Sequence, residues 1–490
     1  MDNENNNSGV VELELDNMFV TVRNMTKDDE NALWSRLAFK VEVFGSPEPR
    51  WRHLYNRRTK KTYAGLCGEV ATYCKEQGLP YKVIDTRVRH KPNADFHLVE
   101  EIDTPDGKVP LELRPYQKDV VAAARARDVL QAATGAGKTV MLAALIAKFN
   151  VKPVAVFADK ITLCEQLRSE FEKFLGIKVG LVGGGMDTQE DVTVYSLQSA
   201  TEDMVKDAKL IMFDECHHIP ADTCMNVCTM AKDAFYRIGV SATPWRDAGD
   251  DMLIDAALNK RKPELAITAS KLIEGGYLVP PSIYFVPVKQ QFTGRNYQKV
   301  YTQAVIENQE RNMMIRKVVK QMFIRNKHIL VLVQQVKHGE ILKDMITQAL
   351  GGEQVSTVQV TKRNGQQVLV RVPMVEFMNG SDDATRRQAV LQAVKEEKCR
   401  VLIATVIADE GLDLPILDTL VLAGGGKSST RAFQRVGRVL RVYPGKKKAI
   451  VFDFEDFTPM LRRHARVRRK LYKTEPAWEI GKFNVSPYDN

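Results

Sequence analysis

Two runs of short apolar segments, which alternate with helix-like segments, dominate the chain after residue 110. The first run contains RDVLQAA, PVAVFA, VTVYS, KLIMF and RIGVSA, and the second contains HILVLV, RVLIAT, DTLVLAG and KAIVFDF. Alternation of this kind predicts parallel strands covered by helices. The fold class that we predict is therefore α/β, with two tandem parallel-sheet domains and a helical connection over residues 295–326.

Three other segments do not follow this alternation. Residues 1–104 mix strand-like and helix-like patterns and predict a small N-terminal α+β domain, of which we expect the first 20 residues to be disordered or loosely tethered. The turn-rich EIDTPDGKVP predicts a linker. Two β-rich arms around Asn364-Gly365 predict a β-hairpin inserted in the second run. The expected domains are residues 1–104, 105–285 and 286–490, with the inserted β-hairpin over residues 353–373.

The charge of the chain is unevenly distributed. It has 71 Lys and Arg against 61 Asp and Glu, a formal net charge of +10. Residues 50–91 hold eleven basic and three acidic side chains, and residues 427–473 hold fifteen and three. The net charges of these two blocks, added together, exceed the net charge of the whole chain, so the remainder of the chain is acidic. Such concentration indicates a polyanionic partner, although one block alone is equally typical of a solvated helix face.

Composition also bears on the compartment. No apolar run approaches the roughly 18 residues that span a bilayer. The polar, acidic N-terminus does not have the pattern of a signal peptide. Seven cysteines spread along a long chain favour reduced thiols over a disulfide framework. We therefore expect a cytoplasmic protein that does not associate with membranes.

The segment AATGAGKT, residues 132–139, follows an apolar strand and precedes a helix-like segment. Glycines at such a junction let backbone N–H groups face a phosphate, and the helix N-terminus adds the positive end of its dipole. In this pattern Lys138 reaches the β- and γ-phosphates and Thr139 binds Mg²⁺. Ala132 stands where the general pattern has Gly. The segment predicts an ATP site that uses Mg²⁺.

The segment MFDECHHIPADTCMNVC, residues 212–228, has two interpretations. Its three cysteines and two histidines suggest zinc, but its one suitably spaced cysteine pair has no second pair at a compatible spacing. Alternatively, Asp214 and Glu215 end an apolar strand, where a nucleotide-hydrolysing enzyme holds Mg²⁺ with one acid and activates water with the other. We favour the second interpretation, with Cys216 as a small buried filler and the two histidines as polar links to neighbouring residues.

Six segments occur in a fixed order between Leu111 and Val451: LRPYQ, ATGAGKT, DECHH, SATP, ATVIADEGLDLP and QRVGRVLR. In this order and at these separations they resemble the motifs of superfamily 2 helicases and translocases. SATPWRDAGDD and KLIEGGYLVPP resemble segments of the XPB-like and phage UvsW-like DNA branch-migration helicases. The resemblance implies two RecA-like domains, ATP and Mg²⁺ as cofactors, and DNA as the partner. For a phage-encoded chain it implies the host cytoplasm as the location.

The resemblance also assigns roles to particular residues. Catalysis is implied for the two acids, the loop lysine and three residues of QRVGRVLR: Asp214, Glu215, Lys138, Gln434, Arg438 and Arg441. Binding of ATP is implied for Arg114, Tyr116, Gln117, Thr134, Gly135, Ala136, Gly137, Lys138, Thr139, Gly411 and Asp413. Metal binding is implied for Thr139 and Asp214, and coupling of hydrolysis to domain movement for His217, Ser241 and Thr243. The arginines suit this role because a guanidinium stabilises the charge on a transferred phosphoryl group.

Contacts to DNA are predicted in the N-terminal block, in the hairpin and at two further residues. Aromatic side chains among basic ones in residues 50–63 suit a phosphate backbone and its bases, the alternative being core aromatics among solvated charges. A basic, polar hairpin tip also suits a phosphate backbone. The predicted residues are Arg50, Arg52, Arg57, Arg58, Lys60 and Lys61 in the N-terminal block, Lys362 and Arg363 in the hairpin, and Ser196 and Thr405 elsewhere.

The sequence thus predicts an ATP-dependent helicase or translocase, monomeric on DNA, that unwinds or branch-migrates forked and branched DNA in replication, recombination or repair. Two alternatives remain. One is an RNA helicase or a translocase subunit of a larger machine, which is disfavoured by His217 at the position where the large RNA-unwinding branch has Asp. The other is an ATP-gated DNA-binding or annealing protein that separates no strands.

Overall fold

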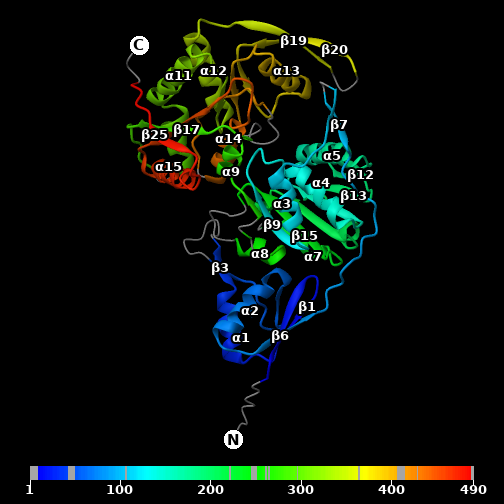
Figure 1. Cartoon of the computed structure of the whole chain (residues 1–490). Helices are drawn as coiled ribbons and strands as arrows, with labels where there is room; N and C mark the ends of the chain where they lie inside the picture. Colours follow the sequence, from blue (N-terminus) through cyan, green and yellow to red (C-terminus); the bar gives the residue numbers. More distant parts are fainter. Residues whose placement is uncertain are drawn as a thin grey trace. The chain divides into compact units, whose positions relative to one another are not determined.

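The computed structural model describes residues 9–41, 50–104, 107–219, 222–243, 251–259, 262, 265–294, 296–361, 365–405, 414–426 and 429–486. The chain divides into two compact units. The first unit comprises Met1–Ala132 and Gly137–Ile267, and the second comprises Ala133–Ala136 and Thr268–Asn490. Each unit contains one large, mainly parallel sheet with helices packed against it (Figure 1).

The N-terminal part of the first unit is a four-stranded sheet in the order β5-β2-β1-β6. Its elements are β1 (Val11–Leu15), β2 (Phe19–Arg23), α1 (Lys27–Arg36), β5 (Lys61–Tyr63), α2 (Cys67–Glu76) and β6 (Tyr81–Asp85), with β3 (Ala38–Val41) and β4 (Arg50–His53) paired separately. Strand β1 lies inside the sheet, and Leu13 is fully buried. The expected loose N-terminus is therefore wrong from Val11 onward, because the alternation in VELEL buries every second side chain.

This N-terminal domain and the first large sheet share one hydrophobic core. Arg127 and Arg237, on neighbouring strands of the large sheet, are both buried. Arg127 donates to the backbone carbonyl of Asn17, and Nη2 of Arg237 lies 3.0 Å from Sδ of Met18. A Cβ at Gly65 would overlap the backbone carbonyl of Asp255, in the helix Met252–Ala257. The sheet formed by β5, β2, β1 and β6 and the helices beside it are thus packed onto the first large sheet within one unit.

The first large sheet has the strand order β12-β11-β13-β10-β14-β15-β9-β16. All of its neighbouring strands are parallel except β11 and β12. Its strands are β9 (Arg127–Ala132), β10 (Val154–Ala158), β11 (Gly180–Gly183), β12 (Met186–Thr188), β13 (Val192–Ser196), β14 (Leu210–Asp214), β15 (Tyr236–Ser241) and β16 (Ala266–Ile267). The helices of this region are α3 (Pro115–Ala123), α4 (Lys138–Phe149), α5 (Ile161–Leu175), α6 (Glu202–Val205), α7 (Asp222–Met230) and α8 (Met252–Ala257). The five predicted strands of the first run correspond to β9, β10, β13, β14 and β15.

The expected linker before this sheet is instead a small ladder. Strand β7 (Glu101–Thr104) pairs antiparallel with β8 (Gly107–Pro110). Gly107 has a positive φ of 112°, which a glycine adopts without strain. The same turn-forming residues that suggest a linker are those that reverse a hairpin, and this accounts for the difference.

The second large sheet is parallel throughout, in the order β21-β22-β18-β23-β24-β17-β25. Its strands are β17 (Pro281–Val288), β18 (Ile329–Leu332), β21 (Val375–Met378), β22 (Val401–Ala404), β23 (Thr419–Leu422), β24 (Ala449–Asp456) and β25 (Glu479–Lys482). Its helices include α9 (Ala269–Glu274), α10 (Tyr297–Tyr301), α11 (Gln309–Ile324), α12 (Val336–Ala349), α13 (Ala384–Lys395), α14 (Ser429–Arg438) and α15 (Pro459–Tyr472). The expected domain boundary at residue 285 falls inside β17, which pairs along its whole length with β24. The second unit therefore begins earlier, at Thr268.

The inserted segment forms a seven-pair antiparallel ladder between β19 (Val355–Thr361) and β20 (Gln367–Pro373). It is not a free projection, because both strands contact α13. Val358, Val360 and Val372 are buried, whereas Leu369 is 73% exposed. One face of the hairpin is therefore apolar core and the other is open. In the described residues, no helix is long and apolar enough to cross a membrane.

Candidate active site

The phosphate loop connects the end of β9 to the start of α4. Gly135 and Gly137 have φ values of 89° and 76°, in the left-handed region that favours glycine. A Cβ on Gly137 would lie 2.5 Å from Nε2 of Gln117, so only glycine permits this approach. The first N–H groups of α4 have no acceptor within the helix and are available to a phosphate. The loop thus has the conformation that its sequence predicts for an anion site.

Three of the residues predicted to bind ATP lie at the start of α3. Gln117 is 3% exposed, and its Oε1 accepts a hydrogen bond of 2.9 Å from the backbone N–H of Arg114. Nη1 of Arg114 donates to Oη of Tyr116 over 2.9 Å. Since Gln117 also approaches Gly137, the structure brings this motif next to the phosphate loop.

The loop lysine and the second acid form an ion pair: Nζ of Lys138 contacts Oε1 of Glu215. Burial lowers the pKa of Lys138, but the nearby Glu215 and Asp214 carboxylates more than offset this and hold it above its ordinary value. Burial opposes ionisation of Glu215, yet Lys138 and His217 hold its pKa below the usual range. Glu215 is therefore a carboxylate, available to accept a proton or to bind a cation.

Glu215 also has an uncommon backbone conformation. It follows β14 with φ 50° and ψ 54°, a left-handed conformation that is strained for a residue with a Cβ. The side chain is then held by a hydroxyl: Oγ of Ser241 donates to its Oε2 over 3.1 Å. Nδ1 of His217 lies 2.9 Å from the same hydroxyl, and the backbone N–H of Thr243 donates to it over 3.2 Å. The three residues predicted to couple hydrolysis to movement therefore meet at Ser241.

Asp214 and Thr139 are the predicted ligands of Mg²⁺. Burial raises the pKa of Asp214 to about 6, so its carboxylate is poorly compensated by the protein alone. A divalent cation would supply that compensation, and carboxylate and hydroxyl oxygens are ligands that Mg²⁺ accepts. Thr139 is the second residue of α4, next to Lys138. The residues present therefore fit Mg²⁺.

The competing zinc interpretation depended on the cysteines near these acids. Cys216 is 1% exposed and packs against Gly239, where a Cβ would lie 3.0 Å from its Sγ. Cys228 is also buried, and burial raises the pKa of its thiol to about 12. Both therefore have the environment of small buried side chains, as the sequence interpretation expects for Cys216.

In the second unit, the predicted residues of QRVGRVLR lie on and just after α14. Gln434 and Arg438 are separated by four positions, which places them on one face of a helix. Arg441 follows the helix and forms an antiparallel bridge with Leu278. Gly411 and Asp413 lie outside the described residues.

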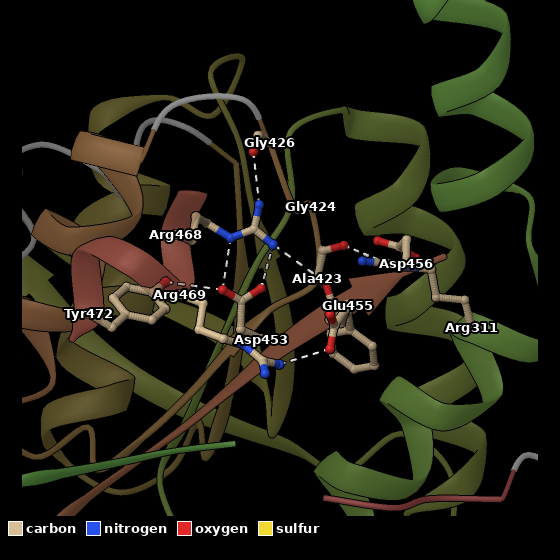
Figure 2. A network of polar contacts seen from close by, with 12 residues as sticks. Arg311, Ala423, Gly424, Gly426, Asp453, Glu455, Asp456, Arg468, Arg469 and Tyr472 are labelled. Carbon is tan, nitrogen blue, oxygen red and sulfur yellow. Dashed lines mark hydrogen bonds and ion pairs between the residues drawn. The ribbon is translucent and has the colours of Figure 1, made fainter. Parts of the chain in front are cut away.

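A buried polar network holds the glycine-rich loop that precedes α14 (Figure 2). Nε and Nη2 of Arg468, on α15, donate to the two carboxylate oxygens of Asp453 over 2.8 and 2.7 Å. Nη1 of Arg468 donates to the carbonyl of Gly426 over 2.9 Å, and Oη of Tyr472 donates to Asp453 over 3.1 Å. Sequence interpretation missed Arg468, because it lies in a run of basic residues that looks uniformly solvent-exposed.

A second buried arginine holds the same loop from another helix. Nε of Arg311, on α11, donates to Asp456 over 2.9 Å, and its Nη1 donates to the carbonyl of Ala423 over 2.6 Å (Figure 2). Arg311 is fully buried. The residues 423–426 are therefore fixed by two charged side chains from α11 and α15, each paired with an acid on β24.

The predicted DNA-contacting residues lie in several places. Arg50 and Arg52 are on β4, Arg57, Arg58 and Lys60 are in the turn before β5, and Lys61 is on β5. Of the aromatic residues among them, Trp51 is 57% exposed, whereas Tyr55 is 1% exposed and belongs to the core. Ser196, at the end of β13, and Thr405, just after β22, are each 7% exposed. Lys362 and Arg363 lie outside the described residues.

Two family models match the chain in tandem. The model described as "Type III restriction enzyme, res subunit" matches residues 110–246, and the model described as "Helicase conserved C-terminal domain" matches residues 314–443. The first range contains the phosphate loop, the acids and Ser241. The second contains β18, β21, β22, β23 and α14.

Known proteins resemble the chain over most of its length. Putative helicase 22 of a Sulfolobus islandicus filamentous virus is 26% identical over 66% of this chain and 60% of its own. DNA 3'-5' translocase XPB2 of Sulfurisphaera tokodaii is 24% identical over 74% and 87%. ATP-dependent DNA helicase uvsW of Enterobacteria phage T4 is 23% identical over 83% and 81%. The chain thus spans less than two thirds of the viral relative and most of the other two.

A solved structure supports the fold. A fragment of a putative HsdR subunit of a type I restriction enzyme from Vibrio vulnificus is 15% identical, with a TM-score of 0.53 over 92% of each chain. The two family models lie in the order of the two large sheets, and the relatives carry helicase or translocase names. The chain therefore belongs to the superfamily 2 helicases, as an ATP-dependent helicase with UvsW and XPB2 among its relatives.

Proposed function

We propose that this helicase hydrolyses ATP on DNA and uses the energy to unwind or branch-migrate forked and branched DNA. The observation that carries the proposal is the Lys138–Glu215 ion pair, because it joins a phosphate-binding group to a proton acceptor at one point. The DNA named for the XPB2 and UvsW relatives supports DNA as the track. The basic N-terminal block supports a polyanionic partner.

The residues of the first unit suggest how hydrolysis would begin. Lys138 would exchange the Glu215 carboxylate for phosphate oxygens, assisted by the N–H groups at the start of α4. The released Glu215, anionic because of its low pKa, would orient a water molecule and accept its proton. Mg²⁺, held by Thr139 and Asp214, would neutralise phosphate charge.

Two further groups of residues complete this proposal. Gln434, Arg438 and Arg441 would supply the positive charge and hydrogen bonds that the transferred phosphoryl group requires. Ser241 would report the state of Glu215 to the chain that follows β15, because its hydroxyl contacts Glu215, His217 and Thr243.

The test is a strand-displacement and ATPase assay on forks, four-way junctions and plain duplexes, made of DNA and of RNA. We expect DNA to stimulate ATP hydrolysis, and strand separation or branch movement to require ATP and to be fastest on branched DNA. Stimulation by RNA alone would establish the RNA-helicase alternative. DNA-stimulated hydrolysis accompanied by annealing, with no strand separated on any substrate, would establish the annealing alternative.

A further inference from the structure

The N-terminal domain contains a cavity of about 680 Å³ that is lined by none of the helicase motifs. Its volume is in the range of roughly 300–1,000 Å³ that is typical of small-ligand sites. The residues that line it are Phe19, Trp34, Arg52, His53, Leu54, Tyr55, Asn56, Arg57, Thr59, Lys61, Thr62 and Tyr63. They come from β2, α1 and the segment from β4 to β5, so the cavity is built within one small domain.

Planar side chains form two of its walls. The ring of Trp34 stacks on His53 with centroids 3.4 Å apart and planes within 4°. The rings of Phe19 and Tyr63 lie 5.8 Å apart on paired strands. Since all four residues line the cavity, a flat ring that enters it meets aromatic surfaces. Stacking on aromatic side chains is the main way in which proteins hold unpaired bases.

Cations lie beside these rings. The guanidinium carbon of Arg57 is 4.3 Å from the centroid of Trp34, and Nζ of Lys61 is 5.7 Å from that of Phe19. Arg57 and Lys61 are exposed, as expected for side chains that contact a phosphate at the rim of the cavity. Among the described residues, none that lines the cavity is acidic. The site therefore combines aromatic surface with positive charge.

Two of the lining residues have buried hydroxyl groups. Tyr55 and Thr62 are each 1% exposed, and neither hydroxyl has a hydrogen-bond partner within the described ranges. Buried polar atoms normally have partners. Each of these oxygens is closed to solvent, so it adds to the binding of a ligand only if the lining shifts.

We propose that this cavity binds one unpaired nucleotide of a DNA strand, with the base among the aromatic residues and the adjoining phosphates on Arg57 and Lys61. A strand is favoured over a free nucleotide because further exposed cations, Arg58 and Lys60, continue beside the rim. The inference rests on the proposed action on DNA and specifies that the protein grips unpaired as well as paired DNA. It adds a DNA site outside the two large sheets.

The cavity lies in the first unit and is connected to the first large sheet and its helices at two points. Phe19 directly follows Met18, which contacts Arg237 of the first large sheet. Gly65 lies two residues after Tyr63, and its backbone abuts Asp255 of α8. A nucleotide held against Phe19 and Tyr63 is thus fixed relative to the sheet that carries Lys138 and Glu215.

The experiment is photocrosslinking of the full chain to a single-stranded DNA oligonucleotide that contains 5-iodouracil, followed by peptide mapping. We expect crosslinks on peptides that contain Trp34, His53 or Tyr63. The double variant Arg57→Glu/Lys61→Glu should lower their yield by about tenfold, the order of effect that loss of one stacked and charged base contact produces.

The matched control is Lys75→Glu/Lys82→Glu, which changes the charge of the same domain equally at exposed sites that do not line the cavity. It should leave the crosslink yield within a factor of about two, because distant surface charges are screened. Equal loss in both variants, or crosslinks confined to residues 107–486, would overturn the proposal. Full competition by dTMP at the concentration of the oligonucleotide would also overturn it, because it would indicate a free-nucleotide site.

The ATPase rate is measured on the same samples. DNA-stimulated hydrolysis without crosslinks in the N-terminal domain would remove the cavity proposal and leave the proposed function intact. Crosslinks in the cavity without DNA-stimulated hydrolysis would support the cavity proposal and contradict the proposed function.

Discussion

The hydroxyl of Ser241 donates a 3.1 Å hydrogen bond to the carboxylate of Glu215, across two neighbouring parallel strands. The strained acid after β14 is thereby tied to the end of β15. Because Lys138 contacts the other oxygen of the same carboxylate, Glu215 is held at both of its oxygens. A change at the phosphate loop therefore reaches the end of β15 through a single side chain.

We predict that Glu215→Gln retains ATP binding and loses turnover, by roughly 10²–10⁴-fold, as expected when a general base is removed. Lys138→Ala should lose nucleotide binding as well, because the phosphates lose their cation. Binding is measured by fluorescence anisotropy of a labelled ATP analogue, and turnover by phosphate release. Glu202→Gln, an exposed acid paired with Lys232, is the control and should behave as the parent protein. Hydrolysis at the parent rate by Glu215→Gln would show that another residue activates the water.

We predict that Ser241→Ala separates hydrolysis from strand movement. The carboxylate of Glu215 keeps Lys138 and His217, so ATP turnover should remain measurable. Base pairs opened per ATP hydrolysed should fall, because the link to β15 is lost. The ratio is obtained from parallel unwinding and phosphate-release traces, with Ser199→Ala as the control. An unchanged ratio would assign Ser241 a purely structural role.

We predict that Arg468→Ala destabilises the second unit by about 3–5 kcal/mol, since it leaves Asp453 buried without its partner. Arg469→Ala is the control, because its pair with Glu455 is partly exposed and such pairs contribute about 0–1 kcal/mol. Thermal unfolding measures both. Arg468→Lys keeps the charge and loses the bidentate contact with Asp453. This variant should therefore fold and show a lower ATPase kcat. An equal stability loss in the two alanine variants would contradict this.

We predict that His338 makes the second unit sensitive to acid. Burial, and then the nearby Arg311, lower its pKa from the ordinary 6.5 to about 3, and its Nε2 lies 3.0 Å from Oδ1 of Asn312. The unfolded chain therefore binds this proton more readily than the folded one. The contribution of His338 is complete above pH 6.5 and is lost as the pH falls toward 3, by up to about 1.4 kcal/mol per pH unit.

Urea unfolding at pH 7 and pH 5 tests this, with His338→Gln as the comparison. The glutamine can still donate to Asn312 but does not titrate in this range. We expect the fall in unfolding free energy between the two pH values to be smaller in His338→Gln by about 1–2 kcal/mol. Identical falls in the two proteins would mean that other groups account for the acid sensitivity.

We predict that the hairpin separates strands, and that its tip carries the effect. Replacing residues 354–372 with a Gly-Ser link should preserve DNA-stimulated ATPase and lower strand separation, but it also exposes the surface of α13 that Val358 and Val360 cover. The sharper variant is Lys362→Glu/Arg363→Glu, with Lys320→Glu/Arg325→Glu, near the C-terminal end of α11, as the charge-matched control. Strand separation should fall only in the tip variant. Parent rates on every branched substrate would exclude the hairpin as the separating element.

The sequence predicted the elements whose periodicity is unambiguous. The strands around Lys138 and Asp214 are continuous apolar runs followed by chemically distinctive residues, so their place at the ends of parallel strands could be inferred. The contacts between Glu215 and Ser241 could be expected only as a family property, because they join residues that are distant in sequence. Their geometry depends on which strands are neighbours, and periodicity does not give that order.

The basic block at residues 427–473 shows why charge counts are less informative. Fifteen basic residues suggest a surface, yet Arg435 and Arg468 are buried, and Lys446 donates to the carbonyls of Pro415 and Leu417. Burial lowers the pKa of Lys446 to about 8. Long side chains can reach backbone acceptors inside the fold. A local count therefore does not separate a DNA-binding face from an internal clamp.

The shared core of the N-terminal domain and the first large sheet has a mechanical consequence. A domain joined only by a linker could rotate when DNA exerts a force on it. Part of the movement driven by each ATP would then not be transmitted to the DNA. Here the buried side chains of Arg127 and Arg237, with the apolar residues around them, form a stiff coupling instead. A force on Trp34 or Tyr63 would therefore strain the strands beside the phosphate loop and would not rotate the N-terminal domain. The N-terminal domain and the first large sheet would move as one rigid body.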